Sequence, residues 1–252
     1  MRSSGIVLLI VGPLLALAGC TAAAPAHGAD EFSAWASTQE HVASVESSAD
    51  GTFTAHLVVD GTIDADGLLA LTSAARDEAA ALGYDAAGVN IIVGNAWGFS
   101  LGAGDVNVAT VNTLRENPLL VGATVNYEPL DPPADYVGGL HATVGSQAGL
   151  RDAPASLLAA YTGAGGDLTA LPVAVSTGDG TFAIVGVGDA QPAAAIALWQ
   201  AVSGRVFPLS AVAAVGADGA ETLELTVGSA DEKTAAEAVG EQHPDVALTV
   251  TF

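Results

Sequence analysis

Cysteine is almost absent from this sequence, whose 252 residues include a single one, Cys20. One thiol excludes an internal disulfide framework and any metal site built from several thiolates. Long apolar runs are missing too. Residues 6–17 form an apolar run that would rise only about 18 Å as a helix, too short to cross a bilayer. A folded domain in this chain must therefore be held by its own apolar core.

Basic side chains are scarce. The chain has 6 lysines and arginines against 28 aspartates and glutamates, which gives a formal net charge of −22. Such a surface repels phosphate backbones and anionic lipid headgroups, so we expect neither nucleic-acid binding nor electrostatic attachment to a membrane. The acidity could serve an acidic binding site or the solubility of a chain that is 50% hydrophobic, and we favour solubility.

The first twenty residues, MRSSGIVLLIVGPLLALAGC, have the layout of a secretory signal. A positive charge at Arg2 precedes the apolar run, and small residues precede Cys20. The tetrad LAGC at 17–20 resembles the lipobox of bacterial lipoproteins. The resemblance implies that residues 1–19 are a signal peptide that is removed, and that Cys20 carries a diacylglycerol on its sulfur.

A lipidated Cys20 implies where in the cell the protein is located. Two acyl chains, at about 0.8 kcal/mol for each buried CH₂, give stable anchoring where one gives only marginal binding. We therefore expect the protein at the cell membrane, lipid-anchored and facing the extracytoplasmic side, with residues 20–35 as the lipidated tether. The alternative is an ordinary signal peptide with a chance cysteine at its cleavage site.

Hydrophobic periodicity predicts an alternation of strands and helices. Alternating apolar residues predict strands at 53–59, 88–93, 97–101, 121–127, 139–144, 171–177, 181–187, 211–215, 221–227 and 246–252. Apolar stripes of helical period predict helices at 64–82, 105–114, 152–161 and 189–202, and one that follows Ser229. The alternation of Val246, Leu248, Val250 and Phe252 along the last strand predicts that Phe252 lies in the core.

Hairpins that alternate with single helices favour an α+β fold. The order βαββαβ is that of ferredoxin-like domains, and segments 41–127 and 171–252 share an element order. We predict two ferredoxin-like modules with antiparallel sheets and helices on one face. The proline-rich stretch 128–135 is the best internal boundary, which gives a first module at 36–130 and a second at 136–252.

The strongest catalytic motif is Gly98-Phe99-Ser100-Leu101-Gly102, a match to the G-x-S-x-G nucleophile elbow with His243 later in the chain. A nucleophile elbow needs a strand-to-helix turn in a parallel sheet. Here the alternation around Ser100 is typical of a hairpin strand, so a serine hydrolase using Ser100 and His243 is the alternative and not our first hypothesis.

Other chemistry is weakly supported by the sequence. The 5 histidines have no metal-ligand spacing, and the acidic stretch 60–67 fails the calcium-loop template, so we expect its aspartates to serve turns and helix caps. No phosphate-binding glycine loop is present, and we expect no cofactor. Trp97 and Phe99, near Asn95, could form an aromatic binding surface for a sugar or a peptide.

The sequence thus predicts a lipid-anchored extracytoplasmic protein, held to the membrane through Cys20. Its role is most simply that of a non-catalytic binding or interaction module. The sequence identifies neither a protein partner nor a small-molecule partner.

Overall fold

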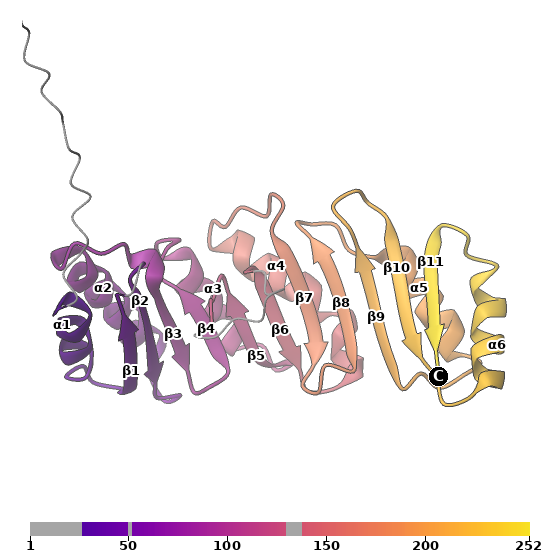
Figure 1. Ribbon diagram of the computed structural model, residues 1–252, viewed down its shortest axis with the longest axis horizontal. Helices are drawn as coiled ribbons and strands as arrows, with labels where there is room; N and C mark the ends of the chain where they lie inside the picture. The colour runs from indigo at the N-terminus through magenta and orange to yellow at the C-terminus, as the bar shows by residue number, and fades with distance from the viewer. Residues whose placement is uncertain (1–26, 50–51, 130–137) are drawn as a thin grey trace, which may run out of the picture.

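A computed structural model describes residues 27–49, 52–129 and 138–252 (Figure 1). Within these residues the chain forms one mixed sheet of 11 strands, and the order of the strands in the sheet is their order in the chain. The strands are β1 (Val42–Ser48), β2 (Thr54–Val59), β3 (Val89–Val93), β4 (Trp97–Ser100), β5 (Leu120–Val125), β6 (Leu140–Val144), β7 (Pro172–Thr177), β8 (Phe182–Val187), β9 (Ser210–Val215), β10 (Glu221–Thr226) and β11 (Val246–Thr251).

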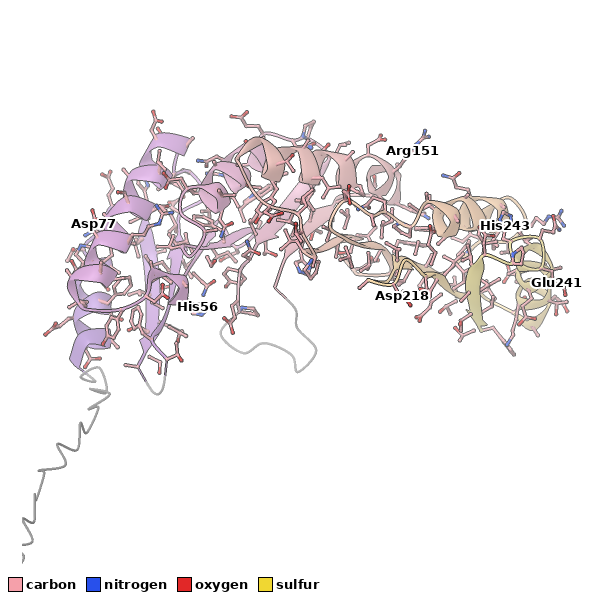
Figure 2. The ribbon with its side chains drawn as sticks, turned by 90° about the horizontal axis from the view of Figure 1, so that it is seen from above. His56, Asp77, Arg151, Asp218, Glu241 and His243 are labelled. Carbon is pink, nitrogen blue, oxygen red and sulfur yellow. The ribbon has the colours of Figure 1, made fainter. Side chains whose placement is uncertain are left out.

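The described helices lie on one face of this sheet, and none of them covers the other face (Figures 1 and 2). The α-helices are α1 (His27–Ala36), α2 (Ala65–Ala81), α3 (Val106–Arg115), α4 (Ala153–Gly163), α5 (Ala193–Ser203) and α6 (Ala230–Gly240). Two short 3-10 helices, η1 (Ala86–Gly88) and η2 (Gln147–Arg151), precede β3 and α4.

The sheet repeats one unit along the chain. The pairs β1–β2, β3–β4, β5–β6, β7–β8 and β9–β10 are antiparallel. Each pair is followed by a helix that leads to the next strand, which pairs in parallel with the strand before the helix. A helix is the usual connection between neighbouring parallel strands, because the chain must return to the same end of the sheet. The result is an elongated two-layer protein.

The prediction of two ferredoxin-like modules with antiparallel sheets is therefore wrong. From β2 to β11 the predicted strands and α-helices occur in the predicted order, whereas α1 and β1 were not among the predicted elements. The strand after each helix from α2 to α6 lies directly beside the strand before it, so that half of the pairings are parallel. A ferredoxin-like module would instead leave room for another strand between them. Strands β5 and β6, on either side of the boundary predicted at 128–135, pair with each other, so the sheet continues across it.

Local signals explain where several elements begin and end. Asp64 caps α2, since its side chain accepts a hydrogen bond from the amide of Gly67 at 2.7 Å. Ser229 accepts from the amide of Glu232 at 3.3 Å at the start of α6. These caps satisfy amides that the first helical turn leaves unpaired, and they confirm the predicted starts of both helices. Gly180 and Gly219 supply the positive φ of two hairpin turns.

The core lies between the helices and the sheet. In α2 the buried stripe includes Leu68, Leu71, Ala75 and Ala79, as its periodicity predicts. Helix α1 packs against the first strands, and its Phe32 is completely buried. Residues 27–35, within the range predicted as a tether, are therefore helical and part of the packed body, whereas Cys20 and residues 1–19 lie outside the described residues.

The prediction that Phe252 belongs to the core is wrong. Strand β11 ends at Thr251, and Phe252 is 70% exposed, with the Nζ of Lys233 5.7 Å from the centroid of its ring. Among the described residues, none of the helices combines the length and the apolar character that crossing a bilayer requires.

Candidate functional site on the open face of the sheet

The face of the sheet opposite the helices, here called the open face, carries two of the buried polar side chains of the described residues, His56 and Asn90. Cross-strand register places Glu46 opposite His56, His56 opposite Asn90, and Asn90 opposite Ser100. We call these four residues the polar row. His56 is only 7% exposed and Asn90 only 2%, although both lie on the side of the sheet that no described helix covers. Something other than a helix must bury them.

The segment 126–129, here called the strap, is part of that cover. It follows β5 and begins with Asn126, whose φ of 49° turns the chain. The amide of Glu128 then donates to Oδ1 of Asn90 at 3.0 Å, and the ring of Tyr127 meets that of His56 edge to face, with 6.0 Å between ring centroids. The strap is therefore fixed on the polar row by a hydrogen bond and a ring contact.

Gly98 makes room for the strap. A Cβ atom at this position would lie 2.9 Å from Cδ2 of Tyr127, closer than real Cβ contacts allow. A second atom would also be too close: Cγ2 of Thr124, on the neighbouring strand β5, would lie 3.2 Å from the added Cβ. Gly98, the first glycine of the apparent nucleophile-elbow motif, thus leaves the space in which the ring of Tyr127 packs.

Burial sets the electrostatics of the polar row. Desolvation lowers the pKa of His56 below its ordinary value of 6.5, and the nearby carboxylates of Glu128 and Glu46 only partly oppose this shift. Burial also raises the pKa of Tyr127. Nδ1 of His56 has no hydrogen-bond partner within the part of the chain that the structure describes. At neutral pH this histidine is therefore an uncharged side chain with an unused polar atom.

Ser100, at the other end of the polar row, belongs to an amide network. Nδ2 of Asn107, on α3, donates to the carbonyl of Ser100 at 2.8 Å and reaches its Oγ at 3.3 Å. Nδ2 of Asn126 donates to Oδ1 of Asn107 at 3.2 Å. Since Asn107 is completely buried, these bonds join the end of β4 to the start of the strap and have a structural role.

The structure does not bring Ser100 and His243 together. Ser100 ends β4, whereas His243 lies between α6 and β11, and six strands separate β4 from β11 in the sheet. Two histidines of the open face, His56 on β2 and His141 on β6, are each two strands away from β4, about 9–10 Å at the usual strand spacing. A general base must approach its nucleophile to about 3 Å. None of these histidines meets this requirement.

The predicted aromatic surface is not assembled either. Asn95 lies in the exposed turn between β3 and β4 with a φ of 60°. Trp97 packs against the core, and Phe99 is completely buried beneath the helices. The residues of β4 that face the open side are Gly98 and Ser100.

Metal ligands do not gather in the described residues, where no group of three His, Cys, Asp or Glu side chains could hold an ion. The acidic stretch 60–67 serves structure as predicted: Asp64 caps α2, and Asp60 accepts from the amide of Thr62 at 2.8 Å. The hydrogen bonds from Thr62 hold the pKa of Asp60 below its usual range.

Sequence reasoning missed the polar row and the strap. One local signal was present, because Asn90 is a polar residue inside the apolar strand GVNIIV. The contacts of His56 with Tyr127 and of Asn90 with Glu128 join distant segments, and no local pattern predicts them.

Beyond the polar row, the residues that β6–β9 direct to the open face include no Asp, Glu, Lys or Arg side chain. They are half-buried and small or of medium size: His141, Thr143, Pro172, Ala174, Ser176, Ala183, Val185, Val187, Ser210, Val212 and Ala214. In a chain with 28 acidic residues this uncharged area, here called the neutral face, is distinctive.

No protein-family model, no curated protein and no solved structure matches this chain. The geometry of the open face is therefore the basis for assigning a function.

Proposed function

We propose that this chain is a lipid-anchored extracytoplasmic binding protein that is not an enzyme, and that its neutral face contacts a protein partner. The observation that carries the proposal is the one-sided sheet: four neighbouring strands present uncharged, half-buried side chains on a face that no described helix covers (Figure 1).

The neutral face has the physical properties of a protein-binding surface. Depletion of charged residues is one of the features that distinguish the centre of protein interfaces from the rest of a protein surface. Acidic side chains elsewhere on the molecule keep it soluble, while the Ala and Val side chains of this face carry no charge that a partner would have to desolvate. Small side chains also lose little rotamer freedom on binding. A flat partner surface fits this face better than a small ligand does.

The lipid anchor, which rests on the lipobox resemblance, would position this face. Residues 21–26 separate Cys20 from α1, so the chain can reach at most about 25 Å from the lipid to the folded body. Helix α1 lies at one end of the elongated sheet (Figure 1). Eleven strands at about 4.8 Å spacing extend roughly 48 Å from β1 to β11. The neutral face, on β6–β9, would lie about 24–38 Å from β1 along that length, within reach of other proteins at the membrane surface.

Photo-crosslinking tests the proposed surface. A benzoylphenylalanine replacing Val185 on the neutral face is expected to form a defined adduct with a protein in membranes that contain the full chain. The matched control replaces Ala201, which is exposed on the helical side in α5. No adduct at position 185, or the same adducts from both positions, would contradict the proposal.

The anchor is tested separately. Mass spectrometry of the protein extracted from membranes should find an acylated cysteine at position 20 as the first residue, and Cys20→Ala should release the protein or stall its processing. An unmodified Cys20 on a membrane-free mature protein would refute lipid anchoring without bearing on the neutral face.

A further inference from the structure

A groove of about 560 Å³ opens on the helical side of the sheet between η2 and α5. It lies on the opposite side of the sheet from the neutral face, and a ligand bound in it would leave that face free. Its volume falls within the range of about 300–1,000 Å³ that is usual for small-molecule sites. The groove is thus a second candidate site, independent of the proposed function.

The floor of the groove is apolar and rigidly held. Leu150, Ile184 and Trp199 line it, and each is less than 10% exposed. The ring of Trp199 stacks on that of Phe182, with 5.8 Å between ring centroids and an interplanar angle of 6°. Because these side chains are already packed, a ligand does not have to order the protein first. The half-buried Ile196 and the exposed Ala148, which also line the groove, add apolar surface that a ligand can cover.

The rim of the groove is polar and carries a cation. Gln147, Arg151, Gln200 and Ser203 line the groove together with its apolar residues, and none of the lining residues is acidic. In a protein of net charge −22, a concave site with one arginine and no carboxylate has a charge opposite to that of its surroundings.

Arg151 differs from most of the other described cations, whose charged groups are already engaged. Arg76 pairs with Asp105 at 2.6 Å, Arg115 donates to the carbonyl of Ile63 at 2.8 Å, and Lys233 faces Glu237 at 3.8 Å. Arg151 is exposed and, within the described residues, makes neither an ion pair nor a side-chain hydrogen bond (Figure 2). Its guanidinium is therefore available to a ligand.

We propose that this groove binds a small amphiphilic carboxylate, whose acid group contacts Arg151 and whose hydrocarbon body lies on Ile196 and on the packed floor of the groove. A guanidinium is suited to a carboxylate because its planar donors match the two carboxylate oxygens. The apolar floor accepts the hydrocarbon, and the absence of acidic lining residues avoids repulsion. Neutral amphiphiles lack the contact with Arg151, and short polar anions lack the contact with the floor.

Titration calorimetry with decanoate, below the concentration at which it forms micelles, tests the proposal on the whole protein. We expect saturable binding to one site, and binding weaker by about tenfold or more in Arg151→Gln, which corresponds to about 1.4 kcal/mol. Decanol, which has the same chain without the charge, should bind the wild-type protein as weakly as decanoate binds that variant.

The matched control is Arg205→Gln. It removes the same charge from an exposed arginine that follows the lining residue Gly204 without lining the groove itself. It should leave decanoate affinity nearly unchanged, whereas Ser203→Phe, which places a ring in the groove, should abolish binding. Equal losses in both arginine variants, equal binding of decanol and decanoate, full binding to Ser203→Phe, or no decanoate binding would overturn the proposal.

Discussion

Replacement of Gly98 by alanine tests whether Tyr127 is seated on the open face. The added methyl group would lie 2.9 Å from Cδ2 and 3.0 Å from Cγ of the Tyr127 ring, and 3.2 Å from Thr124. Overpacking of this kind costs about 1–3 kcal/mol, since the ring or the strand must shift. We expect Gly98→Ala to lower the free energy of unfolding by this amount, measured by urea denaturation.

A double-mutant cycle separates the ring contact from other effects of the methyl group. In a Tyr127→Ala background the two closest contacts, with the ring, are gone, and the contact with Cγ2 of Thr124 at 3.2 Å remains. There Gly98→Ala should cost clearly less than in the wild-type protein. Gly178→Ala is the control, because its nearest new contact would be Cγ2 of Thr143 at 3.9 Å. An equal loss of unfolding free energy from Gly98→Ala in both backgrounds would refute the packing of the Tyr127 ring against Gly98.

Three further predictions concern His56, the core and Ser100. The lowered pKa of His56 means that the folded state binds its proton less readily than the unfolded state, so its contribution to stability is present above pH 6.5 and is lost as the pH falls below it. Denaturation between about pH 7 and about pH 5 should show this loss, and His56→Gln should reduce it. Leu223→Ala, at a completely buried position, should cost about 2–5 kcal/mol in thermal or urea unfolding, whereas Phe252→Ala should cost less than about 1 kcal/mol because Phe252 is 70% exposed. A fluorophosphonate probe should leave Ser100 unlabelled because no described histidine lies within about 3 Å of it, and labelling that disappears in Ser100→Ala would contradict this.

The secondary structure could be predicted from the sequence because its signals are local. Alternation along residues 221–227 and the stripe of 64–82 depend only on neighbouring positions, and the structure has β10 and α2 there. Helix α1 was missed although Ala29, Phe32 and Ala36 form a buried stripe of helical spacing. The small residues and the proline of TAAAPAHGAD, at 21–30, had indicated a flexible tether there instead. Phe252 was misplaced because alternation was extended past the last paired residue, Thr251.

The arrangement of the strands could not be predicted in the same way. Whether the strand after a helix lies beside the strand before it, or one position further away, depends on contacts across the sheet. Leu57 on β2 pairs with Ile91 on β3, and α2 lies between them in the chain, but the same residues could line an antiparallel neighbour. The site follows the same rule, since His56 and Tyr127 meet only because strands β2 to β5 lie side by side in order.

A charge placed in the neutral face gives the most direct test of the central claim, that this face binds a protein partner. Ala174 faces the open side beside Val185 in the antiparallel register, and it is half-buried by its neighbours. In Ala174→Asp the yield of the adduct formed from position 185 should fall at least about tenfold, since a carboxylate inside an uncharged contact loses its hydration without gaining a partner. Ala238→Asp, an exposed site on α6, should leave the yield unchanged. An undiminished adduct in a folded Ala174→Asp protein would contradict the claim.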